Sequence, residues 1–171
     1  MQIRPVIATL LQDIADPVFV ITGHSLGGAT AIIAAVSLLD LVSNPVIYTF
    51  GGPRVGNLAF VNHVQSQKEL TLFRVVHNHD VVVHVPPCTW SLSSSTCDGE
   101  GYPRHIPVEV LYNHDMTRYK VCNMQDGEDI TCAASFSRIS YSIREHLTYF
   151  DVNFNNQKAI LLPDANQFST L

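Results

Sequence analysis

Residues 18–28 read VFVITGHSLGG and place one serine, Ser25, between a hydrophobic run and a run of small residues. The β-branched and aromatic residues of 18–22 predict a β-strand that is buried on both faces, as in a parallel sheet. Residues 26–42 predict a helix that is apolar on almost every side and therefore buried as well. A G-x-S-x-G sequence between a strand and a helix is typical of a nucleophile elbow. Ser25 is therefore a candidate nucleophile.

The turn around Ser25 has to be sharp, and small neighbours make it possible. A serine at this position takes a strained backbone conformation, so we expect Gly23 and Gly27 to let the strand and the helix approach each other. The helix directs its N-terminal amides at the hydroxyl, and the amide of Leu26 is the expected oxyanion donor. His24 is adjacent in the chain and cannot easily act as the base, so we expect it to pack beside the elbow. A structural serine in a glycine-rich turn is the alternative.

Strands and helices alternate along the first half of the chain. Strands are predicted at 18–22, 45–50 and 72–77, and helices at 2–15, 26–42 and 58–67. This rhythm is typical of a parallel sheet covered by helices, so the predicted fold class is α/β. Further along, a hairpin and a last helix are predicted, the hairpin from 108–112 and 118–122 and the helix over 136–150.

Composition bounds the domain organisation and the partners. The 171 residues, 46% of them hydrophobic, suffice for one domain with its own core. We expect that domain over 1–150, with an insertion at about 86–133 and a polar tail over 151–171. The formal charge of −5 and the lack of basic runs argue against a nucleic-acid binder. The longest apolar run, 29–39, is about half as long as a membrane span, and the N-terminus makes a poor signal peptide.

A serine hydroxyl needs a base to take its proton, and the base needs a third group to orient it. In α/β folds of this kind the three residues follow in the order serine, acid, histidine, at the carboxyl ends of strands. Asp80 comes directly after the predicted strand 72–77 and is therefore the candidate acid. His77, His79 and His84 crowd Asp80, and with it they also allow a metal cluster as an alternative.

The base is chosen from eight histidines by topology. His63 falls on the surface of the predicted helix 58–67, while His105 and His114 fall in the insertion. His146 is the only histidine after the insertion, so it alone can return to the edge of the sheet late in the chain. We therefore expect His146 to be the base.

The four cysteines lie in the second half of the chain, and none has the C-x-x-C spacing of a zinc site. Three pairings are possible, and we favour the two local ones, Cys88–Cys97 and Cys122–Cys132. Four free thiols are the alternative, but exposed cysteines in polar loops are unusual unless they are paired. Disulfides would indicate an oxidising compartment, and hence secretion.

Four segments carry a more specific pattern in their order and spacing. They read GHSLGGA at 23–29, TFGGPRVGN at 49–57, DVVVHVPP at 80–87 and HLTYF at 146–150. This series resembles successive motifs of the class 3 lipases, the fungal-type triacylglycerol lipases and the related feruloyl esterases. The resemblance spans residues 18–150, implies an α/β-hydrolase fold, and assigns Ser25 as nucleophile, Asp80 as acid and His146 as base. It also places Cys122 and Cys132 where similar lipases have a local disulfide.

The sequence departs from the family before the elbow. Family members carry a long segment there, which holds the first strands, the lid helix and a Ser or Thr that makes the second oxyanion contact. This sequence starts one helix before the elbow. The resemblance therefore covers the C-terminal portion of the family's domain, and we expect the N-terminal strands and the lid to be lacking. No residue is assigned as lid or as second oxyanion donor.

The expected activity is hydrolysis of a carboxylic ester through an acyl-serine intermediate. The resemblance implies acylglycerol substrates, met at a lipid–water interface, and it implies no metal or organic cofactor. Two alternatives remain: a feruloyl or short-chain esterase, and a non-catalytic fragment that needs its missing N-terminal half. The acyl pocket and the lid would distinguish a lipase from a feruloyl or short-chain esterase. By the resemblance, most residues of the pocket and the lid belong to the segment before the elbow.

Overall fold

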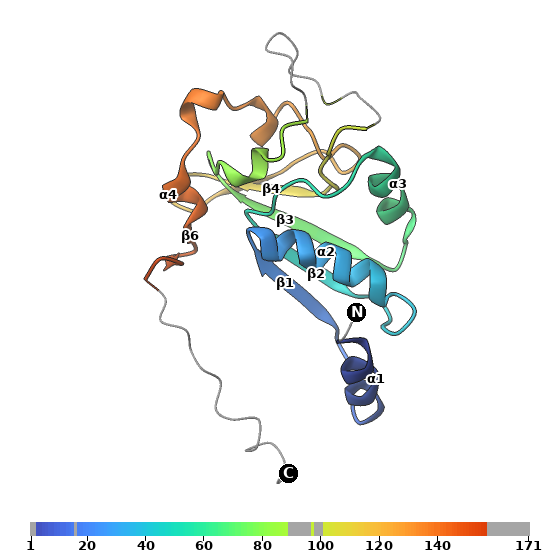
Figure 1. The fold of residues 1–171 in the computed structure, drawn as a ribbon. Coiled ribbons are helices and arrows are strands. Elements are labelled where there is room, and N and C mark those ends of the chain that lie inside the picture. The colour runs from blue at the N-terminus through green and yellow to red at the C-terminus, as the bar shows by residue number, and fades with distance from the viewer. Residues whose placement is uncertain (1–2, 16, 89–96, 98–100, 157–171) are drawn as a thin grey trace.

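A five-stranded sheet forms the centre of the computed structural model, which describes residues 3–15, 17–88, 97 and 101–156. The strands lie in the order β1-β2-β3-β4-β5 (Figure 1). They are β1 (Val20–His24), β2 (Val46–Phe50), β3 (Thr71–His77), β4 (Glu109–Tyr112) and β5 (Tyr119–Val121). The first four run parallel and β5 runs antiparallel to β4. The predicted α/β class with a mostly parallel sheet is confirmed.

The main core lies between one face of this sheet and two helices. Helices α2 (Leu26–Leu38) and α3 (Leu58–Ser66) pack on the face to which β2 contributes Ile47 and β3 contributes Leu72. The core is completed by apolar side chains from both helices and two loops, namely Ala29, Ile32, Ala35, Val55, Val61, Val64 and Ile106. The opposite face carries Tyr48 and Phe73, whose rings stack with centroids 5.5 Å apart.

Burial of β1 and α2 is lower than the sequence predicts. Among the described strands β1 pairs only with β2, so it lies at the edge of the sheet, and Val18 and Val20 are 84% and 54% exposed. The prediction of a strand buried on both faces is therefore wrong. Helix α2 buries one side and leaves Leu26 and Ile33 exposed, so the prediction that it is buried all round is wrong too.

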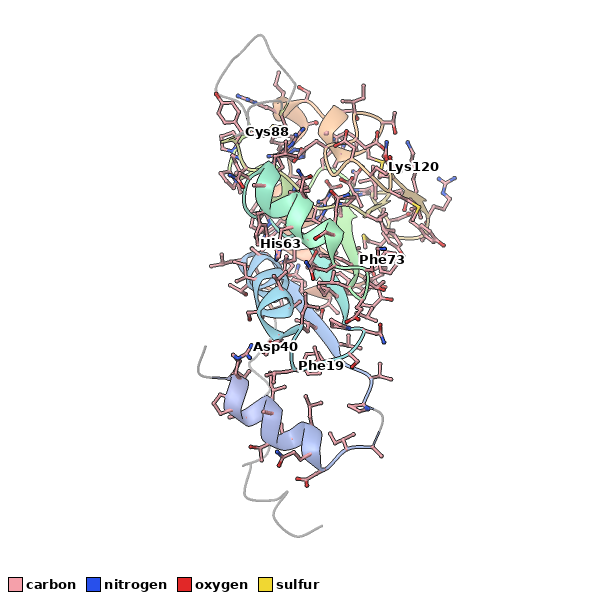
Figure 2. All side chains as sticks on the ribbon, turned by 90° about the vertical axis from the view of Figure 1, so that its right-hand side faces the viewer. Phe19, Asp40, His63, Phe73, Cys88 and Lys120 are labelled. Atoms are coloured by element: carbon pink, nitrogen blue, oxygen red, sulfur yellow. A yellow bond between two sulfur atoms is a disulfide. The ribbon has the colours of Figure 1, made fainter. Side chains whose placement is uncertain are left out.

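Helix α1 (Arg4–Gln12) confirms the predicted first helix within narrower bounds, but none of its residues is buried. It is tied to the loop after α2 by Arg4, whose Nη2 donates to Asp40 Oδ2 over 2.6 Å. Asp40 is labelled beside α1 in Figure 2. Within the described part of the chain, no helix is both long enough and apolar enough to cross a membrane.

The hairpin of β4 and β5 forms where the sequence predicts it, and it extends the central sheet. β4 lies parallel to β3, with Arg74 paired to Glu109, so the segment 86–133 supplies two of the five strands. Both local disulfides, Cys88–Cys97 and Cys122–Cys132, are present in this segment.

The segment 136–150 is not the single helix that the sequence predicts. It contains the one-turn helix α4 (Ile143–His146) and strand β6 (Thr148–Tyr149), preceded by a 3-10 turn. The hydroxyls of Ser137 and Ser142 each accept a main-chain N–H and start a new short element, which competes with a continuous helix. β6 pairs with β7 (Val152–Asn153), so the expected tail begins inside the fold, and residues 157–171 lie outside the described part.

Candidate active site

The elbow between β1 and α2 has the strained geometry that its sequence predicts. Ser25 has φ 57°, a left-handed backbone conformation that residues with a side chain rarely adopt. A Cβ on Gly23 would lie 2.2 Å from the carbonyl oxygen of Gly27, so only glycine allows this approach. A Cβ on Gly27 would meet nothing within 4 Å, so the expectation that Gly27 must lack a side chain for close packing is wrong.

Ser25, His146 and Asp80 form one hydrogen-bonded chain across three elements. The Oγ of Ser25, at the end of β1, lies 2.9 Å from Nε2 of His146, the last residue of α4. Nδ1 of the same ring lies 3.0 Å from both carboxylate oxygens of Asp80, which follows β3. Asp80 is fully buried and His146 is 5% exposed. The arrangement can pass a proton from the serine to the imidazole while a buried carboxylate orients the ring.

Asp80 is held by further bonds to both of its oxygens. Oδ1 accepts from the amide of Val82, 2.7 Å away, and Oδ2 accepts from the hydroxyl of Tyr149, 2.6 Å away. Burial, with the charge of Asp80, raises the pKa of Tyr149 well above its ordinary value, so the phenol stays protonated and donates. Gly51, at φ 57°, leaves the space for this group, because a Cβ there would lie 2.4 Å from Asp80 Oδ2.

His24 packs beside the elbow, as predicted. Its Nε2 donates to the carbonyl oxygen of His146 over 2.8 Å, and the two rings stack with centroids 4.6 Å apart. The ring of Phe154 also stacks on the ring of His24, with the two centroids 3.8 Å apart. Burial lowers the pKa of His24, which favours a neutral ring in this stack. His24 therefore supports His146 and does not face Ser25 as a base.

Leu26 is the first residue of α2 and follows Ser25 directly. The first amides of a helix have no partner inside the helix, so they are available to an oxyanion that forms at the serine. The carbonyl of Ser25 accepts from the amide of Gly28 over 2.9 Å, which begins the helical pattern at the elbow. The Leu26 side chain is exposed.

The histidines that crowd Asp80 in the sequence diverge in space. Nδ1 of His77 donates to the carbonyl of Thr148, 2.6 Å away, and Nδ1 of His79 lies 2.8 Å from the hydroxyl of Ser140. The ring of His84 stacks on Tyr141 with centroids 4.0 Å apart. The metal-cluster alternative requires the three rings and Asp80 to converge on one point, and they do not. His63 is exposed on α3, as predicted.

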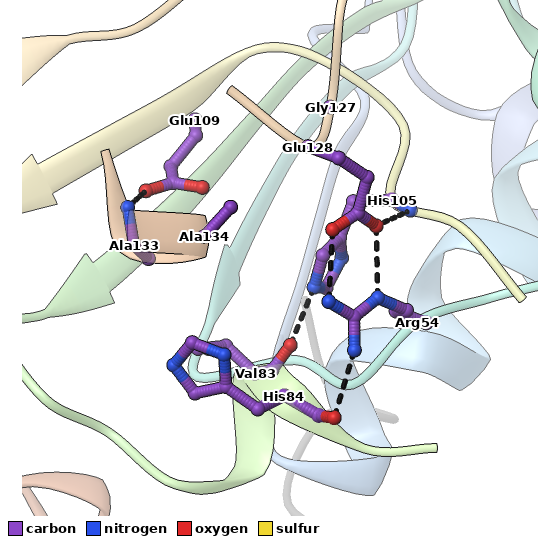
Figure 3. A pocket seen from close by; sticks show the side chains of 9 residues that line it. All are labelled: Arg54, Val83, His84, His105, Glu109, Gly127, Glu128, Ala133 and Ala134. Atoms are coloured by element: carbon purple, nitrogen blue, oxygen red, sulfur yellow. Dashed lines mark hydrogen bonds and ion pairs between the residues drawn. The ribbon is translucent and has the colours of Figure 1, made fainter. Parts of the chain in front are cut away.

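A second group, here called the ion-pair cluster, consists of buried Arg54, Glu128 and His105 together with half-buried His84 (Figure 3). Nε and Nη2 of Arg54 each donate over 2.8 Å to one oxygen of Glu128. Nη1 of Arg54 donates to the carbonyl of His84, and Nε2 of His105 donates to the carbonyl of Val83. Both carbonyls belong to the 3-10 turn η1 (Val82–His84), so this cluster fixes the turn that follows Asp80.

Charge in the ion-pair cluster is balanced inside the protein. Burial alone would raise the pKa of Glu128, but the hydrogen bonds and the charge of Arg54, together with His105, lower it to about 2. Burial and then the charge of Arg54 lower the pKa of His84 to about 4. Burial also lowers the pKa of His105. A cavity of about 10 Å³ adjoins these groups, and His84 Nε2 and His105 Nδ1 have no hydrogen-bond partner among the described residues.

Comparisons with known proteins place the chain in a family. The family model "Lipase (class 3)" matches residues 1–90. This chain belongs to the class 3 lipase family. A curated relative, the secreted mono- and diacylglycerol lipase 1 of Fusarium solani, is 36% identical over 133 residues, which are 77% of this chain and 37% of that protein.

Solved structures of other lipases share the fold. The crystal structure of the Rhizopus microsporus var. chinensis lipase matches with a TM-score of 0.74 and 36% identity, over 87% of this chain and 49% of that chain. A triacylglycerol lipase whose catalytic centre is described as a serine protease triad matches with a TM-score of 0.69 and 32% identity, over 86% of this chain and 54% of that one. This member of the class 3 lipases thus spans about a third of the length of its curated relatives and about half of the solved chains.

Three residues that contact the site in this class 3 lipase homologue were not identified from the sequence. Tyr149 bonds to Asp80, Phe154 stacks on His24, and Gly51 leaves room for the carboxylate. Tyr149 lies in the HLTYF segment and Gly51 in the GGP turn after β2, so both were within quoted motifs. Phe154 lies beyond residue 150, in the segment expected to be a polar tail, where no pattern pointed to it.

Proposed function

We propose that this chain hydrolyses carboxylic esters, acylglycerols above all, with Ser25 as nucleophile, His146 as base and Asp80 as the orienting acid. The observation that carries the proposal is the 2.9 Å separation of Ser25 Oγ and His146 Nε2, combined with the two 3.0 Å contacts of His146 Nδ1 to buried Asp80. It is supported by membership of the class 3 lipases and by the related triacylglycerol lipase with a serine protease triad.

The reaction proceeds in two halves. Ser25 Oγ attacks the ester carbonyl while His146 Nε2 takes its proton, and Asp80 stabilises the imidazolium. The imidazolium then gives that proton to the departing alcohol, and an acyl-serine remains. In the second half, water gives its proton to His146 and attacks the acyl-serine, and the carboxylic acid leaves as Ser25 regains its proton. Bonds from Val82 and Tyr149 keep the Asp80 carboxylate in place throughout.

The oxyanion that forms in both halves needs hydrogen-bond donors. We assign the amide of Leu26 as one donor, because it opens α2 directly after Ser25 and the positive end of the helix dipole lies there. Loss of one such donor costs about 10²–10³ in rate, so the activity of this chain depends on whether a second donor is supplied. The substrate is expected at a lipid–water interface.

The two disulfides support a location in an oxidising compartment, and the Fusarium solani relative is described as secreted. Secretion is therefore proposed for this protein as well. In protein from its natural source, peptides that contain Cys88, Cys97, Cys122 or Cys132 should carry no maleimide after labelling in denaturant unless a reductant was added first. Labelling of all four cysteines without reduction would contradict this location.

The test is ester hydrolysis by the purified chain and by Ser25→Ala, with Ser66→Ala, an exposed serine at the end of α3, as the matched control. We expect Ser25→Ala to lose at least about a thousandfold in rate and Ser66→Ala to keep its rate. Acylglycerol, short-chain and feruloyl esters in the same assay separate the esterase alternatives. Equal rates for Ser25→Ala and the unchanged chain would rule out the proposed nucleophile. No hydrolysis of any ester by the unchanged chain would favour a non-catalytic fragment.

A further inference from the structure

Glu145, the neighbour of His146, directs its side chain toward the segment that carries Asp80. Its Oε2 accepts from the main-chain amide of His79 over 2.9 Å, and its Oε1 accepts from the side-chain amide of Asn78 over 2.7 Å. Glu145 is 5% exposed, so this is a buried carboxylate, and each of its oxygens accepts a hydrogen bond. The residues that it binds lie one and two positions before Asp80.

A third bond brings in the hairpin of β4 and β5. Nδ1 of His114, between these strands, donates to Glu145 Oε1 over 2.7 Å. The main chain of Glu145 is held as well, since its carbonyl lies 3.0 Å from Nδ1 of His77 and its amide bonds to the hydroxyl of Ser142. Glu145 therefore joins three parts of the chain that lie far apart in sequence.

The segments 78–81 and 142–146 lie side by side over several bonds. The amide of Ser142 donates to the carbonyl of His79 over 2.8 Å, and Asp80 and Ser142 form an isolated parallel bridge. The acid comes from one of these segments and the base from the other. The 3.0 Å contacts between Asp80 and His146 thus depend on how these two segments are aligned. Besides Asp80 itself, Glu145 is a second carboxylate that crosses between them.

The partners of Glu145 favour a carboxylate, which can accept at both oxygens at once. Asn78 and the His79 amide offer only N–H groups to it, and His114 donates to it as well, so both oxygens face donors. Glutamine has a single acceptor oxygen. With its NH₂ group at the Oε2 position it faces the fixed N–H of His79, and with its NH₂ group at the Oε1 position it keeps partners only if the Asn78 amide flips and the His114 ring changes tautomer. Burial alone would raise the pKa of Glu145, but the hydrogen bonds from Asn78, His114 and His79 outweigh it and lower the pKa, so the carboxylate is ionised at neutral pH.

We propose that Glu145 is a positioning residue, which aligns the segment carrying Asp80 with the segment carrying His146 and so holds the base against the acid. This inference rests on the proposed function, because the alignment matters for the reaction that Ser25, His146 and Asp80 carry out. Glu145 does not touch substrate in this role. On one side it acts through its hydrogen bond to the main-chain amide of His79. On the other side it acts through the peptide bond that links it to His146, the next residue.

The first test is the phosphonylation of Ser25 by a fluorophosphonate, followed by mass spectrometry of the full chain. This probe reports activation of the serine without needing a complete acyl pocket. We expect Glu145→Gln to lower the maximal inactivation rate by about ten- to a hundredfold, because small misplacements of reacting groups have effects of that size. The concentration for half-maximal inactivation should stay unchanged. Glu69→Gln, which removes an exposed glutamate before β3, should react like the unchanged chain.

The second test reads the alignment without any reaction. The downfield NMR resonance of the His146 Nδ1 proton, which is bonded to Asp80, should be present in the unchanged chain and in Glu69→Gln and be lost or broadened in Glu145→Gln. If Glu145→Gln fails to fold, Asn78→Gly serves instead, because it removes one donor and suits the left-handed backbone at φ 42°. It should lower the inactivation rate severalfold.

The two proposals fail in different ways. A chain whose Ser25 does not react with the probe, but whose Nδ1 resonance changes in Glu145→Gln, contradicts the proposed function and retains the positioning role. A folded Glu145→Gln that reacts at the original rate and keeps the resonance overturns the positioning role. A loss of thermal stability with both readouts unchanged would overturn it too, because Glu145 would then be structural only.

Discussion

Two buried polar groups flank the turn from Asp80 to His84, and they differ in where their hydrogen bonds lead. In the first, bonds run from Tyr149 through Asp80 and His146 and end at the hydroxyl of Ser25, which is half-buried. In the ion-pair cluster, the charges of Arg54 and Glu128 are paired with each other and with main-chain groups. A buried charge by itself therefore does not mark a reactive site. The first group differs in that its chain of hydrogen bonds ends at a half-buried hydroxyl, which is what the proposed nucleophile requires.

The two groups share one support, which makes the comparison testable. Arg54 and His105 bind the carbonyls of His84 and Val83 in η1, and the amide of Val82 in the same turn binds Asp80. Changes in the first group should affect the reaction and spare stability. Changes in the ion-pair cluster should affect stability first and the reaction only through the turn.

The largest effect is expected from Asp80→Asn. A neutral amide no longer stabilises the imidazolium that His146 becomes, and it favours the wrong tautomer, so we expect the ester hydrolysis rate to fall by roughly 10⁴. That corresponds to about 5.5 kcal/mol at the transition state. The measurement is the initial rate with a soluble ester, corrected for folded protein. Asp115→Asn, in the exposed turn between β4 and β5, removes a carboxylate of the same type and should keep the rate. A rate for Asp80→Asn within tenfold of the original would contradict the role of the acid.

Glu128→Gln should give the largest loss of stability. It leaves the guanidinium of Arg54, 9% exposed, buried without its charge partner, and breaking a buried pair in this way costs about 3–5 kcal/mol. Urea unfolding monitored by circular dichroism measures the free energy of unfolding, with Glu69→Gln as the exposed control. A loss below about 1 kcal/mol would mean that the pair behaves like a surface ion pair. The activity of the folded fraction should fall far less than in Asp80→Asn.

The first group could be predicted from the sequence because each member has a positional signal. Ser25 lies in a G-x-S-x-G turn, Asp80 follows a strand, and His146 is the one histidine after the hairpin. In the ion-pair cluster, Arg54 and His84 lie in the segments 49–57 and 80–87 that carry the family pattern, but nothing there indicates that they meet Glu128. Arg54 and Glu128 are separated by 74 residues, and neither lies in a regular element whose period would place it. Long-range pairing of this kind is set by the packing of loops, which the sequence pattern does not encode.

The fold was predicted well where local pattern decides it, and poorly where neighbours do. The order of strands and helices up to β3 follows from periodicity, and so does the hairpin of β4 and β5. Burial of β1 does not, because exposure depends on which strand lies beside it. The segment 136–150 was misjudged because Ser137 and Ser142 hold the main chain in short turns, a local competition that hydrophobic spacing does not reveal.

The pH dependence of stability sharpens the comparison further, through His84. Its pKa is about 4 in the folded protein and about 6.5 when unfolded, so the unfolded state binds more protons between these values. The stability that this ring contributes is complete above pH 6.5 and is lost as the pH falls to 4. The difference amounts to about 3 kcal/mol. Glu128 adds a separate loss at lower pH, from about 4.5 down to 2.

His84→Phe isolates the contribution of His84, because a phenyl ring keeps the stacking on Tyr141 and does not titrate. Measured by urea unfolding at pH 7 and pH 4, the free energy of unfolding should fall by about 3 kcal/mol less in this variant than in the unchanged chain. His105, which also has a lowered pKa, is present in both proteins and cancels in the difference. His63→Gln, on the exposed side of α3, should follow the unchanged chain. Identical pH dependence in His84→Phe and the unchanged chain would mean that the His84 ring is solvated in the folded state. His84 would then not belong to the ion-pair cluster.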